Sequence, residues 1–281
     1  WEAGLTRYVD VGPVRLGADT PVVVRTVGDI PNLARDMAEA MYSAMDGSIS
    51  GRPGTIIAPV GPVDQFPILA ALINERRLDC RDVVVINMDE YLAADGEWID
   101  MAHPLSFRGY MNRKFYDLID PSLTPDPANR VFPDPRDPGS LQTLIEHRRG
   151  VDACFGGVGI NGHIAFNEPP EPGKVMSVEA FAELPTRVLT LSRETRTINS
   201  VTVGGEIAVV PQQAITVGMR EILASRQLRF YCNRPWQRSV VRRLLHGPIT
   251  AACPSSLLRT HADAELVIAD MVAEVPDIQL R

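Results

Sequence analysis

The chain has 281 residues, of which 45% are hydrophobic and 22% charged, as in a soluble globular protein with a sizeable core. Its formal net charge is -7 without a basic block, which argues against nucleic-acid binding, and no apolar run approaches the roughly 20 residues that span a membrane. The four cysteines are widely spaced without a C-x-x-C pair, and the N-terminus shows no signal segment. We therefore expect reduced, buried thiols and a cytoplasmic location.

Short apolar runs alternate with helix-like segments along the chain. The run T-I-I-A-P-V at 55–60 is of the kind that is buried on both faces in a parallel sheet. We expect strands at 22–24, 55–60, 83–87, 151–157, 187–191, 214–217, 228–232 and 266–269. We expect helices at 30–44, 66–77, 110–119, 141–149, 192–200, 220–224 and 237–245. The alternation predicts a doubly wound, mainly parallel sheet flanked by helices, and a single α/β domain over 1–281, because no composition shift marks a boundary.

Two further segments have a composition of their own. Prolines are frequent between 168 and 185, and we expect this long connection to form a lid. Arginines gather between 234 and 243 on a predicted helix, where we expect a solvated face.

A glycine-rich stretch at 155–169 reads F-G-G-V-G-I-N-G-H-I-A-F-N-E-P. Its glycines predict a tight loop that a ligand can approach closely. The loop contains His163 and, five residues later, Glu168. A histidine can move a proton near neutral pH, and a neighbouring carboxylate can orient it. An ordinary turn with a capping histidine is the alternative, but the full string favours an active-site loop.

An acidic pair, Asp89 and Glu90, follows the predicted strand at 83–87 almost directly. Ligand groups in open α/β sheets collect beyond the carboxyl ends of strands, so both residues are site candidates. The alternative is that they start a turn or cap a helix.

These motifs together resemble the glucosamine-6-phosphate deaminase (isomerase) family, which is related in fold to the 6-phosphogluconolactonases. The loop at 156–169 is similar to the family signature over its full length, and N-M-D-E-Y at 87–91 is the second block. Shorter matches are H-P-x-S-F at 103–107, E-T-R-x-x-N-S at 194–200 and A-I-T-V-G at 214–218. The resemblance covers about residues 30 to 270, and the ending I-A-F-N-E-P is the deaminase form.

The resemblance implies four catalytic residues. His163 would open the sugar ring, held by Glu168, with Asn161 contributing, and Asp89 would shuttle a proton between C2 and C1. In the deaminases, forming the 2-ketose releases ammonia. The family implies no metal and no organic cofactor, a sugar or sugar phosphate as the bound molecule, no nucleic-acid or membrane partner, and a homo-oligomer.

The phosphate-binding half of the family pattern differs in this chain. Where relatives have a T-G-G-T-P-like turn, residues 60–64 read V-G-P-V-D, so Pro62 lacks an N–H and Asp64 would repel phosphate. A family lysine after 228–232 is missing, although Arg234 could replace it and Arg196 matches a phosphate-binding arginine. The expected substrate contacts are Gly61, Asp64, Glu90, Gly162, Arg196 and Arg234.

The sequence thus predicts an aldose–ketose isomerase and deaminase for glucosamine-6-phosphate or a related, unphosphorylated amino sugar. A 6-phosphogluconolactonase-like enzyme and a sugar-sensing protein without turnover are the alternatives.

Overall fold

A computed structural model describes residues 8–61 and 64–277 of the chain. Seven strands form one parallel sheet, in which every neighbouring pair runs in the same direction. In spatial order they are β1 (Val23–Thr26), β10 (Ala264–Ile268), β9 (Gln227–Cys232), β6 (Ala153–Gly156), β2 (Thr55–Ala58), β3 (Val84–Asn87) and β5 (Arg130–Val131). The central strands β2, β3 and β6 are buried at every position, as apolar strands covered on both faces must be. The predicted doubly wound parallel sheet is confirmed.

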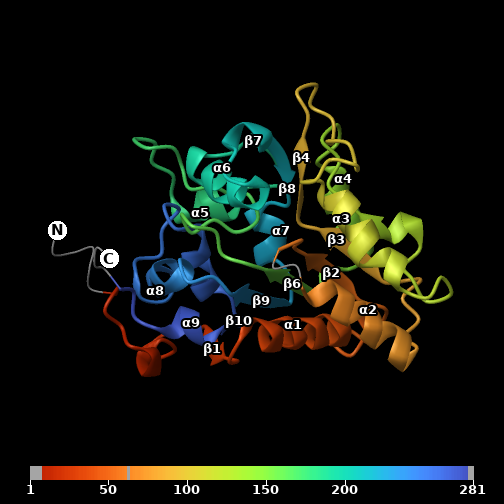
Figure 1. Cartoon of the computed structure of the whole chain (residues 1–281), viewed down its shortest axis with the longest axis horizontal. Helices are drawn as coiled ribbons and strands as arrows, with labels where there is room; N and C mark the ends of the chain where they lie inside the picture. The colour runs from red at the N-terminus through yellow and green to blue at the C-terminus, as the bar shows by residue number, and fades with distance from the viewer. Residues whose placement is uncertain (1–7, 62–63, 278–281) are drawn as a thin grey trace.

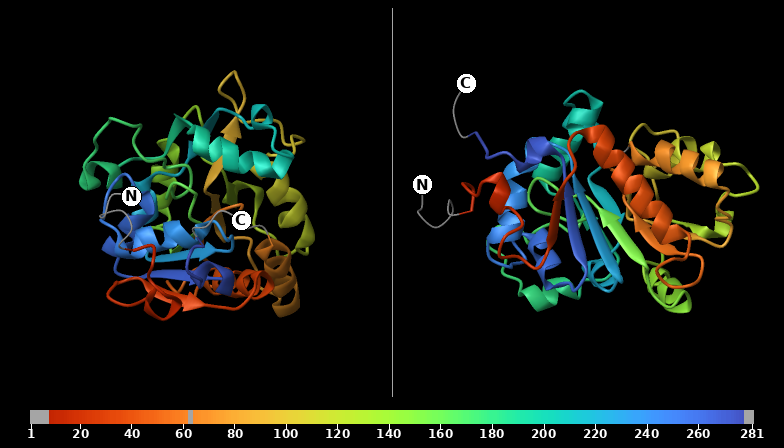
Figure 2. Two further views of the ribbon diagram at one scale, coloured as in Figure 1. Left: turned by 60° about the vertical axis from the view of Figure 1, so that its left-hand side comes forward. Right: turned by 90° about the horizontal axis from the view of Figure 1, so that it is seen from below.

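Helices cover both faces of this sheet, as the edge-on view in Figure 2 shows. One face packs against α1 (Ile30–Met45), α2 (Gln65–Arg76) and α3 (Phe107–Lys114). The other packs against α4 (Ser140–His147), α5 (Val178–Ala182), α7 (Met219–Leu223), α8 (Gln237–His246) and α9 (Asp270–Ala273). The longest of these helices, α1, begins where the Asp29 carboxylate accepts a hydrogen bond from the Asn32 N–H.

A second, smaller sheet was not predicted. It contains β4 (Asp89–Leu92), β8 (Gln213–Thr216) and β7 (Arg187–Thr190), paired antiparallel in that order. Together with α6 (Arg193–Ser200) it occupies the upper part of Figure 1, and it has an apolar cluster of its own around Tyr91 and Phe166. Only Met88 separates β3 from β4, so Asp89 and Glu90 lie in a strand and not in a turn. A one-residue break is too short to be visible as a boundary in an apolar pattern.

Short 3-10 turns join these elements at Pro13–Arg15, Tyr116–Leu118, Pro127–Asn129, Val201–Val203, Ile207–Val209 and Pro254–Thr260. The connection expected to be a lid divides into two parts: residues 171–177 are exposed, whereas α5 anchors the rest through the buried ring of Phe181.

Two predictions about side chains had different outcomes. All four cysteines are buried free thiols, as expected, and burial raises the pKa of Cys80 and of Cys232 to about 12. The prediction of a solvated arginine face between 234 and 243 was wrong for Arg242 on α8, whose side chain is fully buried. Its guanidinium donates to the carbonyls of Val11, Arg238 and Ala273, and so ties the helix to two distant segments.

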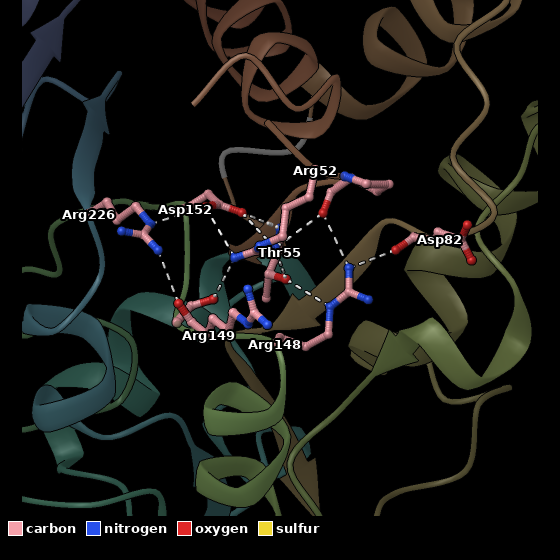
Figure 3. Close-up of polar contacts among 9 residues, drawn as sticks. Arg52, Thr55, Asp82, Arg148, Arg149, Asp152 and Arg226 are labelled. Atoms are coloured by element: carbon pink, nitrogen blue, oxygen red, sulfur yellow. Dashed lines mark hydrogen bonds and ion pairs between the residues drawn. The ribbon is translucent and has the colours of Figure 1, made fainter. Parts of the chain in front are cut away.

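The amino edge of the parallel sheet is held by a buried carboxylate, shown in Figure 3. Asp152, which is fully buried, accepts a hydrogen bond from the Thr55 N–H at 2.9 Å. The guanidinium groups of Arg52 and Arg226 lie 3.3 Å from its two oxygens. Because Thr55 begins β2 and Asp152 precedes β6, this ion cluster fixes the start of two central strands.

Candidate functional site

The glycine-rich loop leaves the carboxyl edge of the parallel sheet, opposite the Asp152 cluster. It follows β6 directly, and a Cβ on Gly157 would lie 3.5 Å from the Tyr231 carbonyl of β9 and 3.9 Å from the Gly61 carbonyl after β2. The ends of three neighbouring strands therefore converge at the loop, which is where open α/β sheets place their sites. The loop carries His163 and Glu168 of the candidate site, and strand β4 of the small sheet carries Asp89.

The imidazole of His163 is held in one position by the loop itself. A Cβ on Gly159 would lie only 2.1 Å from the ring, so the ring packs on the bare glycine backbone. On the other side, His163 Nδ1 lies 2.8 Å from Asn161 Oδ1, which also accepts the His163 backbone N–H at 3.1 Å. Because an amide oxygen only accepts, Nδ1 carries the proton, and Nε2 keeps its lone pair as a base.

The carboxylate of Glu168 lies behind this pair. Its Oε2 accepts a hydrogen bond from Asn161 Nδ2 at 2.7 Å and lies 3.5 Å from His163 Nδ1. Its Oε1 accepts from the Ser192 N–H, at the N-terminus of α6. Burial alone would raise the pKa of Glu168, but the hydrogen bond and charge of His163, with the bond from Asn161, lower it to about 2. Glu168 is therefore a fixed negative charge next to the Nδ1 side of the His163 ring.

Two positioning residues were missed in the sequence. Thr195 Oγ1 lies 3.2 Å from His163 Nδ1, and Ser192 caps α6 by accepting from the Thr195 N–H. The sequence did contain a signal for the capping role of Ser192, because serine is typical of the position directly before a helix. Only the fold could show that this helix begins next to Glu168.

Asn167 is a third positioning residue, fully buried inside the F-N-E-P segment. Its amide donates to the carbonyls of Ile164 and Val217, and its oxygen accepts from Arg187 at 2.7 Å. These bonds connect the loop to the strand ends of the small sheet. They explain why an amide, with both donors and an acceptor, stands at this position.

Asp89 lies beside the same loop. In the small sheet it pairs with Thr216, whose hydroxyl accepts the backbone N–H of Phe166 at 3.0 Å. The Phe166 ring contacts the rings of both His163 and Tyr91, at centroid distances of 6.3 and 5.4 Å. Asp89 is 8% exposed, and no lysine or arginine in the described part of the chain forms an ion pair with it. Burial, followed by the charge of Glu90, raises its pKa well above the ordinary aspartate value.

Glu90 has no exposed surface, although the sequence indicated a substrate contact. Its carboxylate accepts hydrogen bonds from the backbone N–H groups of Tyr91, Phe107 and Arg108 and from the Ser106 hydroxyl. Burial raises its pKa, and these four bonds oppose that effect. The structure thus places Glu90 as an anchor between β4 and the start of α3, where alternating strand geometry turns it away from the face of Asp89.

The residues expected to hold a phosphate do not form one cluster of donors. Arg196 directs its guanidinium to the carbonyls of Ile207 and Val210, and Arg234 is exposed. Gly162 has a φ of +92° and faces Cys253. Gly61 and Asp64 flank the expected turn, but the turn's residues 62 and 63 lie outside the described residues.

Among the described residues, no three histidine, cysteine or acidic side chains group so that they could hold a metal ion. Within the same ranges, 8–61 and 64–277, no helix combines the length and the apolar composition that crossing a membrane requires.

The fold and this site define an α/β protein with a hydrogen-bonded imidazole–carboxylate pair and a second, unpaired buried carboxylate at the carboxyl edge of a parallel sheet. Over 218 residues the chain is 34% identical to the glucosamine-6-phosphate deaminase of Cellvibrio japonicus, covering 75% of this chain and 76% of that protein. The corresponding protein of Exiguobacterium sibiricum is 26% identical over 249 residues, covering 86% and 90%. No family model matches the chain. The chain belongs to the glucosamine-6-phosphate deaminase family.

Solved structures agree with this assignment. A monomeric glucosamine-6-phosphate deaminase superposes with a TM-score of 0.76 at 25% identity, covering 91% of this chain and all of that one. The 6-phosphogluconolactonase from Trypanosoma brucei gives a TM-score of 0.63 at 14% identity, with coverage of 91% and 98%. At that identity the lactonase shares the fold alone.

Proposed function

We propose that this protein is an aldose–ketose isomerase and deaminase that converts a 2-amino-2-deoxy aldose to a 2-ketose and ammonia. Membership of the deaminase family supports the class of reaction. The observation that carries the proposal is the contrast between two titratable groups of the site, the imidazole of His163 and the carboxyl group of Asp89. His163 is held by three side chains with Nε2 free, and Asp89 is buried without a cation partner among the described residues.

His163 opens the sugar ring. Its Nε2 takes the proton of the C1 hydroxyl while Nδ1 stays bonded to Asn161 Oδ1. The resulting imidazolium is stabilised by Glu168 and then gives its proton to the ring oxygen, which breaks the bond between C1 and that oxygen. Asn161 and Glu168 act through His163 and are positioning residues.

Asp89 then moves the proton between carbons. It removes the proton from C2 of the open-chain aldehyde, and the carbonyl oxygen takes up a proton from the substrate's own ammonium group, which gives an enolamine. Returning the proton from Asp89 to C1 yields an iminium ion at C2, and addition of water leaves the ketone and releases the nitrogen as ammonium ion. The raised pKa of Asp89 suits a group that must both accept and return a proton.

The test is turnover of glucosamine and of glucosamine-6-phosphate by purified protein in deuterium oxide, with ammonia and ketose both measured. We expect equimolar ammonia and ketose, with solvent deuterium at C1 only in those turnovers in which the Asp89 carboxyl exchanges its proton with solvent before returning it. Asp89→Asn should abolish both products, whereas Asp117→Asn, an equal loss of charge at an exposed position, should leave them unchanged. Binding of a sugar without either product would instead identify a sugar-sensing protein.

The expected homo-oligomer and the cytoplasmic location remain predictions, as does the single domain over 1–281. A similar deaminase is described as monomeric, so we propose that catalysis needs only one chain. Size-exclusion chromatography with light scattering, run at assay concentrations, tests this point.

A further inference from the structure

Two glutamines occupy equivalent places in the fold, each at the start of a helix that follows a strand of the parallel sheet. Gln65 begins α2 after β2, and Gln237 begins α8 after β9. Strands β2 and β9 lie on either side of β6, whose end leads into the glycine-rich loop. Both side chains are buried, with exposures of 0% and 4%. They form a matched pair on the two sides of the loop.

Only one of the two amides has partners among the described residues. Gln237 Nε2 donates to the Val158 carbonyl at 2.8 Å, and its Oε1 accepts from the Arg234 N–H at 2.8 Å. Neither Nε2 nor Oε1 of Gln65 has a hydrogen-bond partner in residues 8–61 and 64–277. An unsatisfied buried amide costs folding free energy that an apolar side chain of the same shape would avoid. A bond to a bound molecule explains why an amide stands at this position.

The start of α2 adjoins the strand that carries Asp89. Strands β2 and β3 are neighbours, and the N–H of Met88, directly before Asp89, donates to the Ala58 carbonyl of β2 at 2.9 Å. Phe66, the second residue of α2, contacts the Tyr110 ring of α3 at a centroid distance of 6.3 Å. The segments that follow β2 and β3 therefore leave the sheet side by side.

The turn before α2 also reaches the glycine-rich loop. The Gly61 carbonyl lies 3.9 Å from the position that a Cβ on Gly157 would take. Helix side chains tilt toward the N-terminus of their helix, so the side chain of Gln65, the first residue of α2, is directed back to this edge of the sheet. Its exposure of 0% is close to the 9% of His163 and the 8% of Asp89, so the three groups are enclosed alike.

A hydroxyl group matches what Gln65 offers. A carboxamide has two N–H donors and a carbonyl acceptor, and a hydroxyl both accepts and donates. A phosphate dianion only accepts, so it would give Gln65 Oε1 no partner. Asp64, which precedes Gln65, is exposed and its side chain forms no capping hydrogen bond, so its carboxylate adds negative charge that disfavours an anion.

We propose that Gln65 is a substrate-binding residue that sets specificity by hydrogen bonding to a sugar hydroxyl on one of the carbons beyond C2. The inference rests on the proposed isomerase–deaminase function, in which C1 and C2 lie at His163 and Asp89. The amide costs stability in the free protein, and the substrate completes its hydrogen bonds in the complex.

The stability of the ligand-free protein gives the first test. Gln65→Met replaces the amide with an apolar side chain of nearly the same shape, and we expect the melting temperature to stay the same or to rise. Gln237→Met makes the same change where both amide atoms are bonded, and we expect a lower melting temperature. An equal fall for both variants would overturn the inference, because it would show that the protein itself satisfies the Gln65 amide.

Substrate binding gives the second test. The probes are glucosamine, its 6-phosphate and its 3-, 4- and 6-deoxy analogues, and calorimetry on Asp89→Asn protein measures Kd without turnover. We expect Gln65→Met to raise the Kd for glucosamine about tenfold, the order of effect that a lost hydrogen bond has. The Kd of the deoxy analogue that lacks the bound hydroxyl should not change.

Three results would overturn the inference: a Kd for glucosamine that Gln65→Met leaves unchanged or that is undetectable, a tenfold loss for every deoxy analogue, and a loss confined to the 6-phosphate. The last result would assign the amide to the phosphate ester. None of them bears on the proposed function, which release of ammonia and ketose by protein with Asp89 tests separately. Binding that depends on Gln65 without release of either product would instead overturn the proposed function.

Discussion

Two buried aspartates lie at opposite edges of the same parallel sheet. Asp152, at the amino edge, is surrounded by Arg52, Arg226 and the Thr55 N–H, as Figure 3 shows. Asp89 lies beyond the carboxyl edge, where burial and then the charge of the neighbouring Glu90 carboxylate raise its pKa. The amino edge thus satisfies its buried charge, whereas the carboxyl edge leaves one unsatisfied.

The difference explains which edge can do chemistry. The Asp152 carboxylate faces two guanidinium groups and a backbone N–H, so its charge and hydrogen-bonding capacity are used in holding the start of two strands together. An unpaired buried carboxylate costs stability when it ionises and holds its proton more tightly, which is what a proton-transfer group requires. The same residue type is therefore structural at one edge and a candidate catalyst at the other.

The largest effect is expected at Asp89. Asp89→Asn should lower kcat by about 10³-fold, because the group that moves the proton is lost. It should also raise the melting temperature near pH 7. The sign follows from the raised pKa: wild-type stability falls as pH rises through the pKa of Asp89, and the amide cannot ionise. Steady-state kinetics and thermal melts at pH 5 and pH 7 check both. An active variant would exclude Asp89 as the base.

At the opposite edge, Asp152→Ala should lower the free energy of unfolding by about 2 to 4 kcal/mol. It leaves the Thr55 N–H without its acceptor and two arginines without a counter-charge, although both arginines can still reach solvent. The variant that folds should keep its kcat. Urea titration measures the loss, and a change below about 0.5 kcal/mol would show that the cluster contributes nothing to folding.

Glu168 is the paired carboxylate at the carboxyl edge, and it should make the free energy of unfolding depend on pH in the acid range. With its pKa lowered to about 2, it contributes up to about 3 kcal/mol that is present above pH 4.5 and is lost as pH falls toward 2. Glu168→Gln should flatten this part of the stability profile and lower kcat through His163. An unchanged profile between pH 4.5 and 2.5 would contradict the pairing.

The smallest effect concerns Glu90, through its charge on Asp89. A base must be ionised, so kcat/KM should rise with pH through the raised pKa of Asp89. Glu90→Gln removes a negative charge that raises this pKa, so the rise of kcat/KM should occur at lower pH than in the wild type. The pH–rate profile measures this shift. A rise at the same pH in both proteins would mean that burial alone sets the pKa of Asp89.

Much of the fold was readable in the sequence because the central strands are apolar along their whole length. Residues 55–60 and 83–87 were expected as strands, and β2 and β3 lie within those ranges and are buried at every position. Two strands of the small sheet, β7 and β8, were expected at 187–191 and 214–217, and the structure confirms them. Strand β4 was missed because it follows β3 after a single residue, and the antiparallel pairing of the three strands was missed because it joins segments far apart in the chain. Arg242 was misjudged because nothing local reveals which carbonyls a distant segment will bring to it.

The chemistry of the site was determined by residue types in sequence. Proton transfer was already indicated by the imidazole of His163 and the carboxylates of Asp89 and Glu168, because few residue types can perform it near neutral pH. The glycines at 159 and 162 indicated the tight loop that holds the imidazole. Only the tertiary structure decided the roles of their neighbours: Asn161 and Thr195 against His163, Glu90 turned inward, and Arg196 against backbone carbonyls. The physical reason is that reactivity belongs to a side chain, whereas burial, pairing and pKa depend on groups that the fold brings from elsewhere in the chain.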